Sequence, residues 1–141
     1  MTLKHGLMSA LTLASALAGP ATAAEITGVW VAQSRSAHIE IKHCGATVCG
    51  KLLSATQPPT NPSYLDVHNS DPKLRTRSMI GATLLEGFSG GPQKWTGGHL
   101  YNPGDGNTYH GMLTLVDDDH LSVKGCALIF LCKSQTWTRI K

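Results

Sequence analysis

The sequence lacks any apolar run long enough to span a membrane as a helix, which takes about 20 residues. Its longest run, residues 7–18, has only about twelve apolar or small residues, the length of a signal-peptide core. Lys4 and His5 precede this run, Pro20 ends it, and residues 21–23 are small, as a signal peptidase requires. We therefore predict a cleaved signal peptide at residues 1–24. An uncleaved N-terminal anchor is the alternative, and the shortness of the run disfavours it.

The remaining chain is too short for two domains, because about 117 residues build one hydrophobic core. Residues 25–141 are therefore predicted to form a single domain. The sequence also lacks a strong charge of either sign, with 12 Lys and Arg against 9 Asp and Glu and a net charge of +3. Loss of Lys4 with the signal peptide would lower this by one. The basic residues are scattered, which argues against nucleic-acid binding.

The CxxC spacing of redox-active thiol pairs and common zinc hooks is absent. All four cysteines, Cys44, Cys49, Cys126 and Cys132, follow the signal peptide, and an even number in an exported chain predicts disulfides. The pairs Cys44–Cys49 and Cys126–Cys132 are favoured, because each would join two strands across a tight turn, but crossed pairs stay open. A zinc site containing His43, Cys44 and Cys49 is the alternative, which an oxidising compartment disfavours.

Helical periodicity is scarce after residue 25, and the apolar residues recur with period two. Ile39 and Ile41, for example, lie on one face of a predicted strand, with His38 and Glu40 on the other. Evenly spaced strands joined by tight turns predict an all-β fold, an eight-stranded antiparallel up-and-down barrel. The predicted strands are residues 27–33, 37–43, 48–54, 78–88, 94–102, 107–116, 120–126 and 132–140.

One connection, residues 55–77, is far longer than the others and contains four of the seven prolines, which excludes a central strand. Ser70 or Asp71, followed by Pro72, could cap a short helical turn through Arg77. Closure of the barrel would make the first and last strands neighbours. Arg139 could then lie over the indole ring of Trp30.

Six separated motifs occur in order: "GVW", "CGATVCGKLL", "DVHNSDPKLRTRSMIGATLLEGF", "WTGGHLYNPGDGNTY", "LSVKGC" and "SQTWTR". In this order the chain resembles the bacterial exported family called domain of unknown function 2147, over essentially all of residues 25–141. The resemblance implies a lipocalin-like, or calycin-like, barrel in which Trp30 packs against Arg139. It implies no catalytic residues, and His99 departs from the aliphatic residue expected there.

The candidate binding residues lie on the long connection and on two strands. Arg75 and Arg77 could anchor an anionic head group, because guanidinium pairs with carboxylate or phosphate. Trp95, Tyr101 and Tyr109 could form an apolar wall or simply fill the barrel. The alternative for the arginines is pairing within the connection, with Asp66 and Asp71, to hold it against the barrel.

No metal or cofactor is predicted. His99 and His110 could approach each other across a hairpin, but two histidines without a third ligand do not make a metal site. The run at residues 117–119 is most simply a solvated turn, because a calcium site needs six or more oxygen ligands. A G-x-S-x-G motif is absent, so no hydrolase elbow is predicted.

Three hypotheses for function follow. The first is a non-enzymatic protein, periplasmic or secreted, that binds a small apolar or amphipathic ligand in the barrel. The second is a protein-interaction or inhibitor module whose barrel is filled by its own side chains. The third is an enzyme of unrecognised type, which a cleft containing a perturbed titratable group such as Asp66 would favour. An internal cavity distinguishes the first from the second.

Overall fold

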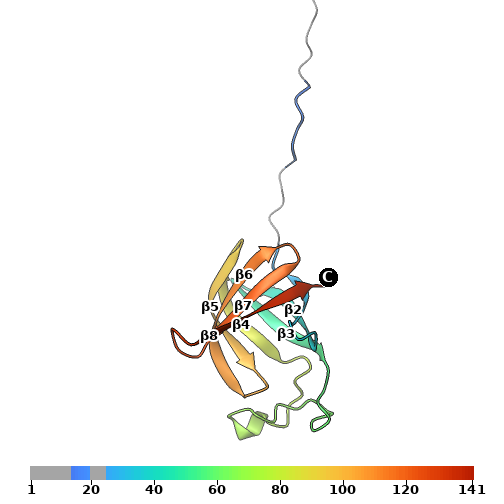
Figure 1. Ribbon diagram of the computed structural model, residues 1–141, viewed down its shortest axis with the longest axis vertical. Coiled ribbons are helices and arrows are strands. Elements are labelled where there is room, and N and C mark those ends of the chain that lie inside the picture. Colours follow the sequence, from blue (N-terminus) through green and yellow to red (C-terminus); the bar gives the residue numbers. More distant parts are fainter. Residues whose placement is uncertain (1–13, 20–24) are drawn as a thin grey trace, which may run out of the picture.

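The computed structural model describes residues 14–19 and 25–141. The predicted signal peptide, apart from residues 14–19, lies outside the described residues. Most of the described chain forms a closed antiparallel barrel (Figure 1). Its one helical element among the described residues is a single 3-10 turn, η1 (Pro72–Leu74), so no described helix has the length to cross a membrane.

The barrel consists of eight strands in sequence order, as the alternating pattern predicts. Each strand pairs with the next, and β1 pairs with β8 through Trp30↔Arg139 and Val31↔Thr138, which closes the sheet. Closure removes the exposed edges that an open sheet would leave. The strands are β1 (Gly28–Val31), β2 (Ala37–Cys44), β3 (Thr47–Ala55), β4 (Thr83–Gly90), β5 (Lys94–Asn102), β6 (Asn107–Asp117), β7 (His120–Cys126) and β8 (Cys132–Arg139).

One predicted strand, at residues 78–88, begins later than its pattern indicates. β4 starts only at Thr83, because residues 78–82 fold back under the long connection. Met79 donates its backbone N–H to the carbonyl of Tyr64 at 2.8 Å, and its side chain is completely buried. Gly81 then turns the chain with a φ of +86°. The apolar residues of this segment therefore pack as a turn rather than as a strand.

Up-and-down topology places alternate connections at the same end of the barrel. One end carries the β1–β2, β3–β4, β5–β6 and β7–β8 connections, and the other carries the remaining turns and the C-terminus. Figure 1 shows the β3–β4 connection, residues 56–82, below the barrel, at the end that also carries the β1–β2, β5–β6 and β7–β8 connections. We call this connection the long loop and this end the open end.

The opposite end is closed by the first and last strands. Trp30 is fully buried and donates from Nε1 to the carbonyl of Ile26 at 2.9 Å. The Arg139 guanidinium lies 4.2 Å from the centroid of the Trp30 ring. Arg139 also donates to the carbonyl oxygens of Thr27, at 2.7 Å, and of Glu25. The closed end thus surrounds a cation with an indole face and carbonyl oxygens.

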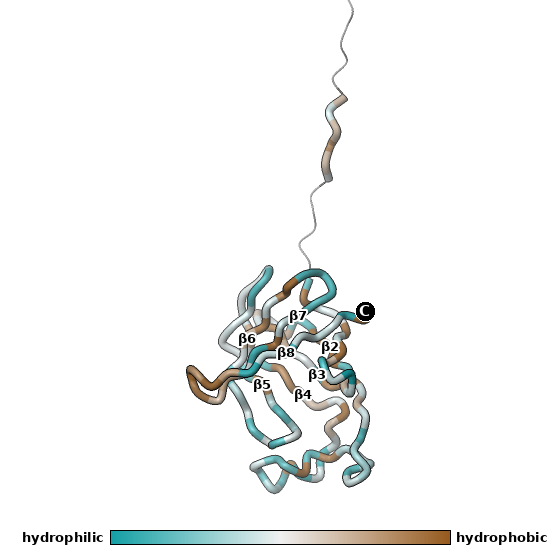
Figure 2. Tube along the Cα trace, viewed as in Figure 1, coloured by the Kyte–Doolittle hydropathy of each residue, from teal (hydrophilic) through white to brown (hydrophobic). Residues whose placement is uncertain are grey.

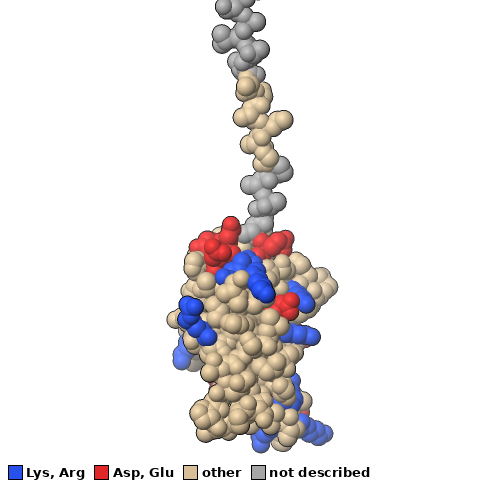
Figure 3. All heavy atoms as spheres, turned by 90° about the vertical axis from the view of Figure 1, so that its right-hand side faces the viewer, with Lys and Arg blue, Asp and Glu red and all other residues tan. Residues whose placement is uncertain are grey.

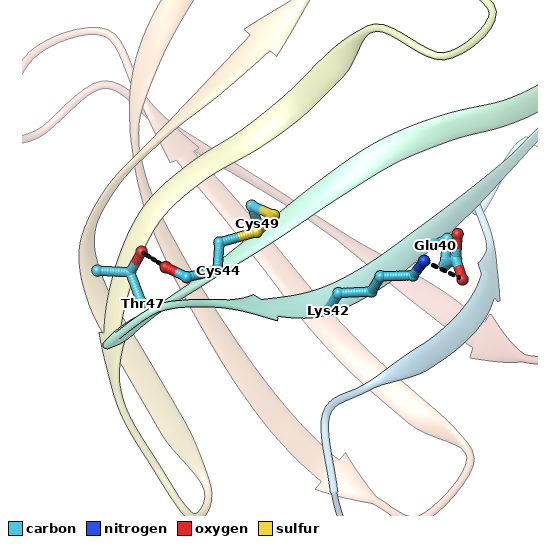
Figure 4. The surroundings of a disulfide bond; sticks show 5 residues. All are labelled: Glu40, Lys42, Cys44, Thr47 and Cys49. Atoms are coloured by element: carbon cyan, nitrogen blue, oxygen red, sulfur yellow. Dashed lines mark hydrogen bonds and ion pairs between the residues drawn. A yellow bond between two sulfur atoms is a disulfide. The ribbon is translucent and has the colours of Figure 1, made fainter.

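Both favoured disulfides are present. Cys44–Cys49 crosses the β2–β3 turn at the closed end, where the hydroxyl of Thr47 also donates to the carbonyl of Cys44 at 3.2 Å (Figure 4). Nearby on β2, Lys42 and Glu40 form an ion pair on the surface at 3.2 Å. Cys126–Cys132 joins the ends of β7 and β8 at the open end. The zinc alternative for Cys44 and Cys49 is therefore wrong.

Candidate ligand-binding cavity

A cavity of about 690 Å³ lies inside the open end of the barrel. An eight-stranded barrel is at the size where side chains either fill the interior or leave room for one small ligand. Here the closed end is filled and the open end is not. The volume lies within the range of about 300–1,000 Å³ that is typical of small-molecule sites.

The wall of the cavity is mostly apolar. Its deeper part is formed by inward-facing side chains of several strands, and its rim by residues of the connections at the open end. The deeper side chains are Ile39, Leu52, Leu85, Leu100, Val123 and Trp137. The rim includes Tyr64, Pro103, Phe130 and Leu131. Such a wall favours ligands with a sizeable apolar part.

Few charged groups reach this cavity. Among the described residues, Asp105 and Lys133 are the charged members of its lining. The hydroxyl of Tyr109 donates to Asp105 Oδ2 at 2.5 Å, and the backbone N–H of Asn107 donates to Asp105 Oδ1 at 2.9 Å. Burial alone would raise the pKa of Asp105, but the hydrogen bonds from Tyr109 and Asn107 outweigh it and lower this pKa. Asp105 is therefore an ionised, already partnered group.

Lys133 differs from Asp105, since its ammonium forms no ion pair with another described residue. It lies on the inward face of β8, in alternation with Gln135 and the buried Trp137. Gln135 accepts a hydrogen bond from Trp137 Nε1 at 2.8 Å, which fixes the amide oxygen toward the wall. Lys133 is consequently the cation available to a ligand at the rim.

A buried carboxylate, Asp66, holds the long loop against the barrel. Its side chain is fully buried, and Asp66 Oδ2 accepts from Nε and Nη2 of Arg77, both at 2.8 Å. The amide of Asn69 donates to the same oxygen at 2.8 Å. The hydroxyl of Tyr101, on β5, donates to Asp66 Oδ1 at 2.5 Å. The long loop is thereby attached to a residue of the cavity wall.

Tyr101 connects the hydrogen bonds around Asp66, which we call the Asp66 network, with the cavity. Burial, followed by its hydrogen bond to Asp66, raises the pKa of Tyr101 to about 12 from an ordinary value of 10.0. Its hydroxyl therefore stays protonated and donates to the carboxylate at neutral pH. The Arg77 guanidinium also lies 5.6 Å from the centroid of the Tyr101 ring. Loop, carboxylate and wall thus form one connected unit.

The predicted site residues divide into two groups. Tyr101 and Tyr109 belong to the lining of the cavity. Trp95 does not: it is buried at the start of β5, at the closed end, about 20 Å along the strand from Tyr101. Arg75 and Arg77 are not in the lining either. Arg77 pairs with Asp66, and Arg75 Nε donates to the carbonyl of Asn69 at 2.8 Å.

Two features of the open end were missed in the sequence. One is Lys133, although the alternation that places Trp137 inward also places Lys133 inward. The other is the β7–β8 connection, residues 127–131, which has the apolar sequence "ALIFL". It forms a projecting loop that is coloured brown, for hydrophobic, in Figure 2. Four of its side chains are largely exposed: Leu128, Ile129, Phe130 and Leu131. The run of five apolar residues between two predicted strands could have indicated this exposed apolar loop from the sequence.

The two candidate metal clusters have simple structural roles. His99 and His110 are cross-strand neighbours on the outside of β5 and β6, with ring centroids 5.3 Å apart. Within residues 14–19 and 25–141, no third His, Cys, Asp or Glu completes a metal site with them. Asp117 accepts from the backbone N–H of Asp119 at 2.8 Å and contacts His120, as the predicted turn requires.

Comparison with known proteins agrees with this architecture. No curated protein shows significant similarity to the chain. A solved structure described as "Protein HP1028 from the human pathogen Helicobacter pylori belongs to the lipocalin family" matches with a TM-score of 0.74 and 24% identity. The match covers 83% of this chain and 84% of that one, and it shows a shared lipocalin-like fold. The family model "Uncharacterized protein conserved in bacteria (DUF2147)" matches residues 28–139. The chain therefore belongs to the DUF2147 family of bacterial proteins.

Proposed function

We propose that this protein is an exported, non-enzymatic binding protein that holds a small apolar or amphipathic molecule in its barrel. The observation that carries the proposal is the 690 Å³ cavity with an apolar wall at the open end. A filled barrel, which the protein-interaction hypothesis requires, would have side chains in this volume. The lipocalin-like fold supports the same function by analogy alone.

The ligand class follows from the distribution of polar groups. The deeper wall is apolar, whereas Asn102, Asp105 and Lys133 lie at the rim. A molecule with an apolar body and one anionic end, such as a fatty acid, would bury its body and place its charge beside Lys133. This assigns the role of polar anchor to Lys133 in place of Arg75 and Arg77, whose guanidinium groups already have partners within the long loop.

The Asp66 network supports a non-enzymatic function. Both carboxylate oxygens of Asp66 accept hydrogen bonds from neighbouring side chains, and the residue is not part of the cavity lining. A general base needs an oxygen within reach of the substrate proton. Asp66 instead has the contacts of a structural group that fixes the long loop.

Export is supported by the predicted signal peptide and by two disulfides, which persist in oxidising compartments. Expression of the full chain in a bacterium, followed by fractionation and mass measurement, tests it. We expect a periplasmic or secreted product that begins at Ala24 or Glu25. A full-length product in the cytoplasm would refute export without affecting the proposed ligand.

Ligand binding is tested by native and denaturing mass spectrometry, and then by titration with a fatty acid and the alcohol of equal chain length. We expect Lys133→Gln to weaken binding of the acid about fivefold, the strength of a partly exposed ion pair, without weakening the alcohol. Lys94→Gln, at the start of β5 near the closed end, is the matched control. Ala37→Phe, which fills part of the cavity, should weaken both ligands. Unchanged binding in Ala37→Phe, with its thermal stability retained, would place the ligand elsewhere.

A further inference from the structure

The β7–β8 connection ends in an apolar tip that nothing in the described chain covers. Leu128, Ile129, Phe130 and Leu131 have exposed fractions of 56, 97, 77 and 56%. Four consecutive large apolar side chains in water are costly, because each leaves apolar area that could be buried. Most other exposed large apolar residues of the described chain stand singly. We define the tip by these four residues.

The tip is held in its projecting position by its own base. Cys126 and Cys132 pair in register at the ends of β7 and β8 and are joined by a disulfide. Ala127 donates its N–H to the carbonyl of Leu131 at 2.9 Å, which closes the loop directly above this bond. Phe130 and Leu131 reach the rim of the cavity, whereas Leu128 and Ile129 do not line it. The apolar side chains of Leu128 and Ile129 are therefore free to contact another molecule or a bilayer.

The hairpin that carries the tip contains charges of one sign. Residues 120–141, which form the whole β7–β8 hairpin and the C-terminus, contain no Asp or Glu. Lys124 and Lys133 lie on the two strands below the tip, one or two residues outside the disulfide. The connections at the open end, with Lys133, carry five basic and three acidic residues. Figure 3 shows acidic side chains toward the closed end on the face presented there, with basic side chains between them.

We propose that the tip docks the open end of the barrel onto an anionic lipid bilayer. Leu128 and Ile129 would enter the boundary between head groups and acyl chains, and Lys124 and Lys133 would contact the anionic head groups. Apolar side chains together with flanking lysines are the combination that binds peripheral proteins to such membranes. A protein partner is less suited, because a stable protein interface buries about 800 Å² on each side, more than a tip of four residues offers.

The two halves of the tip have different surroundings. Phe130 and Leu131 belong to the rim of the cavity, whereas Leu128 and Ile129 do not line it. Docking through the tip would bring the cavity rim to the membrane surface, where amphipathic molecules reside. The docking proposal does not require the proposed ligand, since it rests on the exposure and charge of the hairpin. The two can therefore fail separately.

The test measures binding of the mature chain, residues 25–141 with both disulfides formed, to sedimented vesicles. The vesicles contain phosphatidylglycerol and phosphatidylethanolamine, with phosphatidylcholine vesicles as the uncharged comparison. Replacement of Leu128 and Ile129 together by Ser should lower the partition coefficient at least about tenfold. The matched control replaces Val116 and Ile140 by Ser, which are 57 and 48% exposed but lie near the closed end. Lys124→Gln should weaken binding to anionic vesicles only, and most at low salt.

A second measurement reports insertion directly. Trp30, Trp95 and Trp137 are at most 6% exposed, so a Phe130→Trp variant adds the one indole of the described chain that faces solvent. Anionic vesicles should shift its emission to shorter wavelength. The proposal is overturned if the wild type does not sediment with vesicles, or if the control lowers binding as much as the tip variant. Concentration-dependent dimers that the tip variant abolishes would overturn it in favour of self-association. Sedimentation without binding of any fatty acid would instead refute the proposed ligand.

Discussion

Replacement of Asp66 by Ala tests whether the long loop is held by one buried carboxylate. The wild-type side chain is fully buried and accepts from Arg77, Asn69 and Tyr101. Removal leaves a guanidinium, an amide and a hydroxyl without their common acceptor. Breaking a buried ion pair on one side costs about 3–5 kcal/mol. The Arg77 side chain is 37% exposed and can recruit water, so we expect the lower limit, about 3 kcal/mol.

Asp71→Ala is the matched control for this substitution. Asp71 lies in the same loop, and its side chain accepts one hydrogen bond, from the backbone N–H of Lys73 at 3.0 Å, as the cap of η1. Loss of such an exposed cap costs about 1 kcal/mol or less. The two variants therefore lose the same residue type from the same loop, and the difference between them reports the buried network.

The assay is urea unfolding combined with amide hydrogen exchange. Exchange is needed because the long loop could detach while the barrel stays folded, which would limit the loss in global stability. The amide of Met79 reports opening of the long loop, because it is bonded at 2.8 Å to the carbonyl of Tyr64, another residue of that loop. In Asp66→Ala its protection should fall by about 3 kcal/mol, with the central strands affected no more than this. A loss equal to that of Asp71→Ala in both measurements would refute the reasoning.

Three further outcomes are expected. Gly106→Ala should destabilise the protein by more than about 1 kcal/mol in urea unfolding, because Gly106 has a φ of +73° and a Cβ there would overlap the carbonyl oxygen of His68. Unfolding free energy should fall as the pH rises from 10 toward 12, since the folded state then retains a proton on Tyr101 that the unfolded state loses; Tyr101→Phe should flatten this fall relative to wild type. Arg139→Lys should lower the melting temperature, because an ammonium cannot contact the Trp30 ring and the carbonyls of Thr27 and Glu25 together; equal melting temperatures would contradict this.

The fold could be predicted because its signals are local. Alternation located all eight strands, and the spacing of the cysteines within hairpins indicated both disulfides. Residues 78–82 misled the prediction for β4, because Met79 is buried as part of the long loop, bonded to Tyr64, rather than as part of a strand. Tertiary contacts of this kind leave no periodic pattern.

The candidate site was predicted less completely, because alternation gives the face of a residue and not its depth. Trp95 and Tyr101 belong to one strand, yet Trp95, six positions before Tyr101, lies in the filled end and Tyr101 lines the open cavity. For Arg77 the partner depends on how the long loop folds, and the sequence is compatible both with an anionic head group and with the pairing to Asp66 that the structure shows. Lys133 was overlooked because a charged residue at an inward position contradicts the pattern of a filled core.

The inward face of β8 explains how one barrel can have a closed end and an open end. Arg139, at the closed end, is matched by the Trp30 ring and by backbone carbonyl oxygens, so its charge stabilises the fold. Trp137 and Gln135 follow, bonded to each other. Lys133 comes last, with no ion pair among the described residues, beside an apolar cavity. Lys133 is exposed, so water solvates its ammonium until an anionic group replaces that water. The same strand then continues through the disulfide into the apolar tip, so a molecule that moves between a bilayer and the barrel would meet apolar tip, cationic rim and apolar wall in that order.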